Sequence, residues 1–286
     1  MKRELYDIHK VAARFYYEQL QTDNAHNAVE YLNLRQLSPR TRKIFGLGYA
    51  PINKDALYKT LVEAGFSESA ILKSGLVYKN DNGSYYEKFY NRLMFPIIDV
   101  YGNIIGFGGR VLGDGMPKYL NSPETEIFSK SKNLYNLNLA KKSNNRELIL
   151  VEGYMDAISL HAAGIDWAVA SMGTAFAQEQ AKLLARAADE VVFSYDSDAA
   201  GQRATVRAVS IAKEVGLKVR VLIVPDGKDP DEFVRKHGKD AYLRLIETAV
   251  SGIEFQMQYV ISQNNSFKFS QEKLEAVSNI LPFLLE

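Results

Sequence analysis

The chain has 286 residues, of which 47% are hydrophobic and 24% charged, a composition typical of globular proteins. Its formal net charge of +1 gives no overall signature of a nucleic-acid-binding protein, although a neutral total can conceal a basic patch. The absence of cysteine excludes disulfides and cysteine-ligated zinc, and the four histidines show no metal-ligand spacing. No apolar run approaches the roughly 20 residues of a membrane span, and the start lacks a secretory apolar region, so we expect a cytoplasmic protein without a membrane partner.

Residues 1 to about 75 are predicted to be helical with turns between the helices. Apolar residues recur at helical spacing in DIHKVAARFYYEQL, and NAHNAVEYLNLR begins a second helix. Ser38 before Pro39 is typical of a helix N-terminus, and we expect that helix to end at Gly48. Two more short helices are predicted in NKDALYKTLVEAGF and SESAILKSG.

Residues 76 to about 143 are predicted to be mostly antiparallel β-structure. Asn82-Gly83 lies between two tyrosine-rich runs, which is typical of a hairpin turn. The segment RLMFPIIDVYGNIIGFGGRVL repeats this pattern, with Tyr101-Gly102-Asn103 as its turn.

From residue 147 onward, short apolar runs alternate with helical patterns: ELILV, MDAISLHAAG, WAVASMG, FAQEQAKLLARAA, EVVFSY, AGQRATVRAVSIAKEVG and KVRVLIVP. Such alternation predicts crossover units and a parallel sheet with helices on its faces. We therefore expect an α/β fold in three parts: a mixed α/β part at 1–146, a parallel-sheet part at 147–235 and a helical part at 236–286. The apolar end NILPFLLE suggests that the last part is truncated and that a longer natural chain continues beyond it.

Acidic side chains follow three of the predicted strands. Glu152 follows LILV, Asp196 and Asp198 follow VVFSY, and Asp229 and Asp231 follow VRVLIV. The carboxyl ends of parallel strands meet at one edge of a sheet, where ligands bind, so five carboxylates are expected to share that edge. Carboxylates crowded together raise each other's pKa unless a cation neutralises them, and oxygen ligands favour magnesium or manganese. The small residues after Asp198 leave room for a phosphate at the next helix N-terminus.

Each acidic segment has a plainer interpretation when it is considered alone. An isolated Asp-X-Asp is more often a helix cap or a turn than a metal site, and KDPDE could simply begin the helix at Pro230. Asp156 is either a supporting residue or a helix-start residue, and Gly173 either allows close approach of backbone to the site or forms a turn. Three acidic clusters at three successive strand ends favour the metal site.

The motifs VEGYMD, SYDSDAAG and PDGKDPDE resemble those of the Toprim domain. Upstream, LSPRTRKIFGLGYAP, GFGGRVL and PKYLNSPET resemble the catalytic core of DnaG-type bacterial primases, and this resemblance covers essentially the whole chain. It implies magnesium-dependent synthesis of short RNA primers on single-stranded DNA, with manganese able to substitute. The family's zinc-binding and helicase-binding domains are not expected here, in agreement with zero cysteines, so no zinc is expected in this fragment.

The resemblance also implies roles for individual residues. Asp196 and Asp198 would be metal ligands, Glu152 a ligand or the general base, and Asp229 and Asp231 would hold further magnesium ions. Residues that would contact nucleotide or template are Arg92, Arg110, Lys118, Asn121 and Lys130. Residues 86–146 contain nine basic against five acidic side chains, a local excess that the neutral total conceals. Lys141, Lys142 and Arg146 are expected to be solvated surface charges, and Tyr119 would be either a base-stacking or a core residue.

Three alternatives are less favoured. A topoisomerase-like enzyme needs a nucleophilic tyrosine in a further domain, and a Toprim nuclease is usually smaller, with Toprim near its start. A metal-dependent nucleic-acid-binding module without catalysis would not need all five acids. The primase interpretation implies four kinds of partner: the template, ribonucleoside triphosphates, the RNA–DNA hybrid, and the replicative helicase through the missing domain. We expect the chain to be a monomer.

Overall fold

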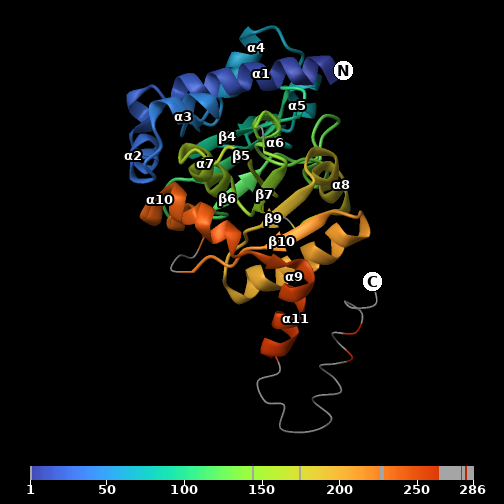
Figure 1. Ribbon diagram of the computed structural model, residues 1–286. Helices are drawn as coiled ribbons and strands as arrows, with labels where there is room; N and C mark the ends of the chain where they lie inside the picture. The colour runs from blue at the N-terminus through green and yellow to red at the C-terminus, as the bar shows by residue number, and fades with distance from the viewer. Residues whose placement is uncertain are drawn as a thin grey trace. The chain divides into compact units, whose positions relative to one another are not determined.

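The computed structural model describes residues 2–143, 145–173, 175–225 and 229–263, together with Ser278 and Leu281. The chain divides into two compact units, Met1–Leu139 and Ala140–Glu286, called here the N-terminal unit and the C-terminal unit (Figure 1). The predicted division into three parts, with boundaries after residues 146 and 235, stays a prediction. The mixed α/β architecture expected from the sequence is confirmed in both units.

The N-terminal unit contains helices and short antiparallel sheets. Its elements are α1 (Lys2–Gln19), a 3₁₀ turn (Asp23–Ala25), α2 (His26–Leu34), α3 (Pro39–Ile44), β1 (Gly48–Ala50), α4 (Ala56–Glu63), α5 (Glu68–Lys73), β2 (Val77–Lys79), β3 (Tyr85–Glu87), β4 (Arg92–Ile98), β5 (Ile104–Val111), β6 (Tyr119–Asn121), a second 3₁₀ turn (Lys130–Lys132) and α6 (Leu137–Ala140). The four-stranded sheet has the order β1-β4-β5-β6, and β2 and β3 form a separate hairpin. Both hairpins predicted from the sequence are therefore present.

The prediction that a helix runs to Gly48 was wrong. Helix α3 ends at Ile44, and Gly48 begins β1, which pairs antiparallel with β4. A three-residue strand is too short to show a period of two, so the sequence pattern did not reveal it. Glycine is required at 48 because a Cβ there would lie 2.6 Å from the Tyr16 backbone.

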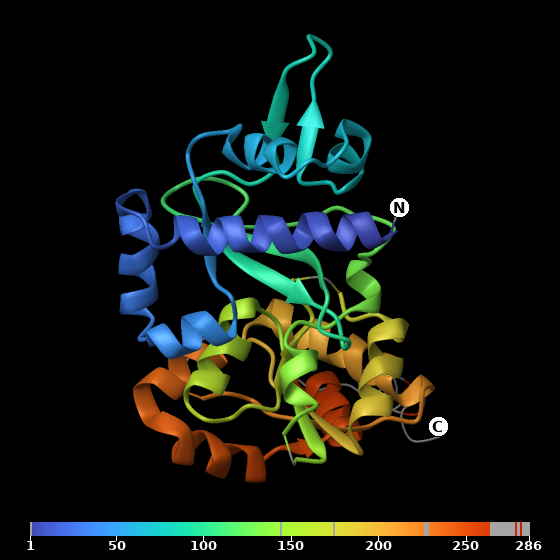
Figure 2. The same cartoon turned by 90° about the horizontal axis from the view of Figure 1, so that it is seen from above.

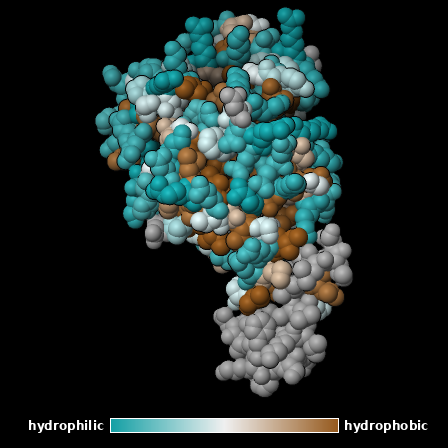
Figure 3. Space-filling model, viewed as in Figure 1, coloured by the Kyte–Doolittle hydropathy of each residue, from teal (hydrophilic) through white to brown (hydrophobic). Residues whose placement is uncertain are grey.

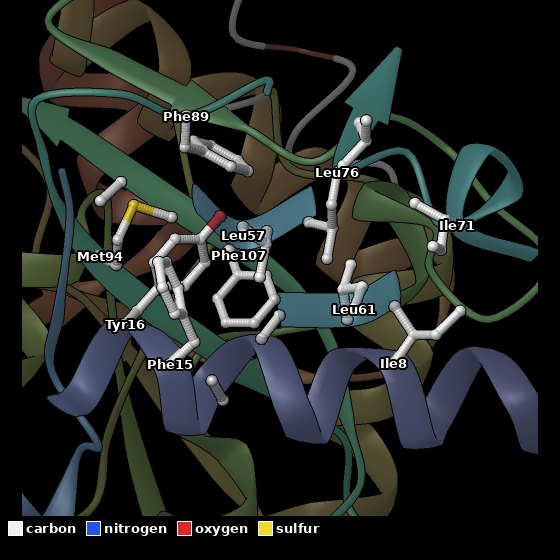
Figure 4. Packing of buried hydrophobic residues seen from close by; sticks show 14 of the residues in the cluster. Ile8, Phe15, Tyr16, Leu57, Leu61, Ile71, Leu76, Phe89, Met94 and Phe107 are labelled. Atoms are coloured by element: carbon white, nitrogen blue, oxygen red, sulfur yellow. The ribbon is translucent and has the colours of Figure 1, made fainter. Parts of the chain in front are cut away.

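The core of the N-terminal unit lies between α1 and the sheet, with α4 and α5 beside it. Figure 2 shows α1 crossing the strands, and its buried stripe includes Ile8, Phe15 and Tyr16. Tyr16 meets Phe107 of β5 edge-to-face at 5.3 Å, as the close-up in Figure 4 illustrates. Burial of each such side chain contributes roughly 1.5–3 kcal/mol to the free energy of folding. These contacts hold α1 against the sheet.

The C-terminal unit is built on one five-stranded sheet. Its elements are β7 (Glu147–Val151), α7 (Tyr154–Ala162), β8 (Ala168–Ala170), α8 (Gln178–Ala187), β9 (Glu190–Phe193), α9 (Ala199–Glu214), β10 (Lys218–Val221), α10 (Pro230–Glu247), β11 (Val250–Ser251) and α11 (Gly252–Gln263). The strand order is β11-β10-β9-β7-β8. Strands β7 to β10 are parallel, as predicted, and only β11 is antiparallel.

The connections give this sheet a topological switch point between β7 and β9. The chain leaves β7 through α7 to reach β8 on one side, whereas it reaches β10 from β9 on the other side through α9. Right-handed crossovers in opposite directions place α7 and α9 on opposite faces of the sheet. Accordingly α7 packs with α10, while α9 packs with α8 and α11 (Figure 1). Loops that diverge in this way leave a crevice at the carboxyl ends of the two strands.

Polar side chains cover most of the face seen in Figure 3. Among the described residues, no helix combines the length and apolar character that crossing a bilayer requires.

Candidate metal and nucleotide site

A pocket of about 440 Å³ lies at the switch point of the C-terminal unit. Three of the predicted acids line it: Glu152 from the end of β7, and Asp196 and Asp198 from the end of β9. Strands β7 and β9 are neighbours in register, Leu150 opposite Phe193, so residues shortly after each strand arrive at the same place. Of the five acids predicted to share one edge of the sheet, these three line one pocket.

Glu152 is joined to the loop that carries the aspartates. Its Oε1 accepts a hydrogen bond of 3.3 Å from the backbone N–H of Asp196. Burial raises the pKa of Glu152, and the charge of Asp198 raises it further. The carboxyl group is therefore held where its charged form is disfavoured, a conflict that a bound cation would relieve.

Asp198 is at once a pocket residue and the N-cap of α9. Its Oδ1 accepts a 2.8 Å hydrogen bond from the N–H of Gly201, three residues into the helix. Gly201 packs directly on the preceding loop, since a Cβ there would lie 2.1 Å from the carbonyl oxygen of Asp196. The glycine after the Asp-X-Asp thus positions the aspartate backbone, in addition to leaving room for a ligand.

Asp229 and Asp231 lie at the N-terminus of α10. Asp229 caps the helix, with its Oδ1 accepting from the N–H of Glu232 at 2.7 Å. Asp231 is 1% exposed, and its carboxylate accepts hydrogen bonds from the Ser159 hydroxyl at 2.5 Å and from Arg235 at 2.9 and 3.1 Å. Neither residue lines the pocket described above. Their role as metal ligands stays a prediction.

Asp156 connects the two groups of acids electrostatically. It is 8% exposed, and its Oδ2 accepts a 3.0 Å hydrogen bond from the N–H of Gly153 at the start of α7. Burial raises its pKa far above the ordinary value, and the charges of Asp229, Asp196 and Asp231 add to this effect. Sequence reasoning left its role open, and the structure shows that it is both a helix-start residue and a neighbour of the acidic site.

The donor chemistry of the pocket fits a hard divalent cation. All three candidate ligands are carboxylates, and mutual repulsion between Glu152 and Asp198 is already evident in the raised pKa of Glu152. In the parts of the chain that the structure describes, no three acidic or histidine side chains converge closely enough to hold one ion together. The acids therefore share a pocket without forming a closed coordination cage.

One wall of the pocket is a face of α9 that sequence reasoning did not assign. The wall consists of Ala200, Gly201, Ala204, Arg207, Ala208 and Ile211. The repeat of small residues at positions 200, 204 and 208 marks one helix face and was the available signal. Arg207 is the one cationic side chain among the described residues that line this pocket.

In the N-terminal unit, Arg92 and Lys118 lie in contrasting settings. Arg92 is 6% exposed, and its guanidinium donates to the carbonyl oxygens of Gly109 at 3.1 Å and Pro117 at 3.0 Å. It therefore joins β4 to β5 and to the segment before β6. Lys118 is exposed, and its backbone carbonyl accepts from the N–H of Val111. Nucleotide contact by either residue stays a prediction.

Arg110 and Asn121 lie on one face of the four-stranded sheet. Arg110 pairs with Tyr119, and Asn121 with Gly108, so the strand alternation places them opposite the face that Phe107 presents to α1. The Arg110 guanidinium lies 3.9 Å from the centre of the Tyr31 ring of α2 and donates to the Val111 carbonyl. Sequence reasoning missed Tyr31, because a contact between helix and sheet leaves no local pattern.

Lys130 lies in the 3₁₀ turn after β6, partly buried. Its backbone N–H donates to the Glu124 carboxylate at 2.8 Å, and burial lowers its pKa while Glu124 opposes this effect.

Comparison with known proteins matches both units to one family. Residues 15–141 match the model of the DNA primase catalytic core N-terminal domain, and residues 149–234 match the Toprim-like model. The DNA primase of Clostridium acetobutylicum is 45% identical over 284 residues, which are 99% of this chain and 47% of that protein. The chain thus spans about half the length of the curated relatives it matches.

Two solved structures are similar over nearly their whole length. The DnaG primase catalytic domain bound to single-stranded DNA has a TM-score of 0.88 and 37% identity, covering 99% of this chain and 93% of the other. The RNA polymerase domain of Mycobacterium tuberculosis primase DnaG has a TM-score of 0.89 and 31% identity, with coverage of 99% and 93%. The Toprim match further implies use of a divalent metal ion. This chain therefore belongs to the family of DnaG primase catalytic cores, with a primase-core N-terminal domain followed by a Toprim domain.

Proposed function

We propose that this chain joins ribonucleotides into short RNA primers on a single-stranded DNA template. The observation that carries the proposal is that Glu152, Asp196 and Asp198 all line one pocket at the switch point of the sheet. A primase-core N-terminal domain precedes this pocket in the chain, which favours polymerisation over the other reactions of Toprim domains.

The proposed reaction is a single displacement at phosphorus. The 3′-hydroxyl oxygen of one nucleotide forms a bond to the α-phosphorus of the next, the bond to the bridging oxygen breaks, and pyrophosphate leaves. No covalent enzyme intermediate is needed, so positioning and charge neutralisation supply most of the rate. The hydroxyl proton needs an acceptor, and we propose Glu152 for this role because its carboxyl group lines the pocket and burial raises its pKa.

Glu152, Asp196 and Asp198 would hold magnesium, with manganese able to substitute, and Asp229 and Asp231 are proposed to hold further ions. When bound, such ions neutralise phosphate charge and polarise the P–O bonds. Glu152 as ligand and Glu152 as proton acceptor remain two forms of this proposal. The N-terminus of α9, capped by Asp198, adds partial positive charge where the phosphates would lie.

Contacts with nucleotide and template are proposed for Arg92, Arg110, Lys118, Asn121 and Lys130. The solved relative bound to single-stranded DNA supports template binding by this family. Phosphate contacts of this kind hold the nucleic acid in place without reading its sequence, so binding should weaken as salt increases. Partnership with a replicative helicase, and a monomeric state, are further proposals.

The test is RNA synthesis by the purified chain on a defined single-stranded template. Labelled ribonucleotides and magnesium or manganese are added, and products are resolved by length and sequenced. We expect short RNA complementary to the template, and a fall of at least about 100-fold for Asp196→Asn. Asp240→Asn is the matched control, because Asp240 is an exposed aspartate of α10 outside the pocket.

Two results would contradict the proposal. Absence of RNA at high protein concentration with manganese would count against a polymerase. Equal amounts of product from Asp196→Asn and Asp240→Asn would exclude this pocket as the active site. The same reactions with end-labelled DNA detect strand cleavage or a protein–DNA adduct, which would indicate a nuclease or a topoisomerase-like enzyme instead.

A further inference from the structure

The α9 wall of the pocket carries one long cationic side chain, that of Arg207. Toward the start of α9 the wall residues are small, with Ala200 and Ala204 on the same helix face, whereas Ile211 lies one turn beyond Arg207. Side chains on a helix lean toward its N-terminus, and for α9 that is the end capped by Asp198. Arg207 therefore has open space between itself and the acidic end of the pocket.

No partner of Arg207 within the described part of the chain explains its place. It is exposed, and in the parts of the chain that the structure describes its guanidinium forms neither an ion pair nor a hydrogen bond. Other arginines of the same unit are engaged: Arg220 binds Glu147 and Glu190, and Arg235 binds Asp231. Among the described residues, none occupies the N–H groups of Arg207, which could therefore donate to a ligand in the pocket.

The chemistry of the pocket indicates what that ligand is. Three carboxylates would be neutralised by the divalent cation, and the guanidinium of Arg207 in the same cavity suits additional negative charge. The planar guanidinium binds phosphate oxygens through two parallel hydrogen bonds, which a lysine cannot reproduce. A polyphosphate that reaches from the carboxylate end toward α9 would meet both groups.

We propose that Arg207 binds the β- and γ-phosphates of the incoming ribonucleoside triphosphate, and hence the leaving pyrophosphate. This inference rests on the proposed polymerase function and adds a residue that determines affinity for the triphosphate. An exposed arginine on a helix can equally be a solvated charge, so position in the pocket is the distinguishing feature. Arg203, also exposed on α9 but absent from the pocket lining, provides the matched comparison.

The first test is kinetic. With the template saturating and the nucleotide concentration varied, Arg207→Gln should raise the KM for nucleotide about 10-fold, while kcat changes by less than about 3-fold. Inhibition by pyrophosphate should weaken by a similar factor, and the Kd for single-stranded template should stay within about 2-fold of that of the unmodified chain. Arg207→Lys should recover part of the loss because it retains the charge, and Arg203→Gln should change none of these quantities.

The second test does not depend on catalysis. Binding of inorganic tripolyphosphate in the presence of magnesium is measured by calorimetry, and Arg207→Gln should weaken it about 10-fold whereas Arg203→Gln does not. Unchanged tripolyphosphate binding in Arg207→Gln would overturn the inference, as would a weakened template Kd with normal pyrophosphate inhibition. If the unmodified chain binds tripolyphosphate through Arg207 yet makes no RNA, the proposed function fails while the anion site stands.

Discussion

Replacing Gly201 with alanine should displace the backbone of Asp196. The added Cβ would lie 2.1 Å from the Asp196 carbonyl oxygen and 2.9 Å from its carbonyl carbon, whereas real Cβ contacts essentially never fall below 3.0 Å. Both obstructing atoms belong to backbone, so no side-chain rotation can remove the overlap. The loop between β9 and α9 must therefore move by about 1 Å, and it carries two of the three carboxylates of the pocket.

The effects on stability and on activity should differ greatly. Overpacking costs about 1–3 kcal/mol, while alanine inside a helix recovers up to about 1 kcal/mol relative to glycine, so the net loss of folding free energy is small. A displacement of about 1 Å at a reacting centre, in contrast, can lower the rate about 100-fold. Gly201→Ala should thus be folded and nearly inactive.

The assay combines RNA synthesis on a defined template with urea unfolding of the same preparation. Ala199→Ser is the control, because Ala199 lies in the same helical turn but is exposed and outside the pocket lining. RNA synthesis by Gly201→Ala within about 3-fold of the unmodified chain would refute the reasoning, since it would show that the Asp196 backbone can move without affecting the reaction.

Four further predictions concern stability and template binding. Burial raises the pKa of Glu87 from 4.5 to about 7. The contribution of Glu87 to the free energy of unfolding is therefore fully present below pH 4.5, and about 3 kcal/mol is lost as pH rises through 7. Urea unfolding at pH 5 and pH 8 should show this loss in the unmodified chain and not in Glu87→Gln. Arg92→Ala should lower the free energy of unfolding by about 2–4 kcal/mol, because the buried Gly109 carbonyl and the Pro117 carbonyl both lose a donor. Unchanged stability with a raised KM for nucleotide would instead support nucleotide contact. Arg220→Gln should lower the free energy of unfolding in urea by about 1–3 kcal/mol, because Arg220 separates the charges of Glu147 and Glu190, which face each other on neighbouring strands. Equal stability would show that solvent already screens the two glutamates from each other. Tyr31→Leu should weaken binding to single-stranded DNA about 3-fold, measured by fluorescence anisotropy. Tyr31→Phe keeps the ring under Arg110 and should bind normally. Equal losses in both variants would show that the ring contact with Arg110 does not contribute to binding.

The order of strands and helices in the C-terminal unit could be predicted because each element there leaves a local pattern. Apolar runs such as ELILV and EVVF became β7 and β9, and the spacing of acids after them placed Glu152 and Asp196 at one edge. That inference needed only the general property that parallel strands end at a common edge. The short strands β1 and β11 have no such pattern, because three or two residues cannot show a period.

Roles that depend on packing across the fold could not be predicted. The plainer interpretation of the Asp-X-Asp, a helix cap, holds for Asp198 together with its place in the pocket, and a local motif cannot distinguish one role from both. Asp231 contacts Ser159 because α7 packs against α10, whereas its other partner, Arg235, lies one turn along the same helix; its expected role as a metal ligand stays a prediction. The contact of Arg110 with Tyr31 likewise joins residues 79 positions apart.

Binding of manganese to the purified chain tests the central claim most directly, because it examines the three carboxylates without requiring turnover. Electron paramagnetic resonance counts bound ions in the unmodified chain and in a variant carrying Glu152→Gln, Asp196→Asn and Asp198→Asn; asparagine at 198 keeps the cap of α9, so the helix should remain intact. We predict bound manganese in the unmodified chain and in Asp240→Asn, and fewer bound ions in the triple variant, in which only ions held by Asp229 and Asp231 would remain. Undiminished binding in the folded triple variant would contradict the assignment of the metal site to this pocket.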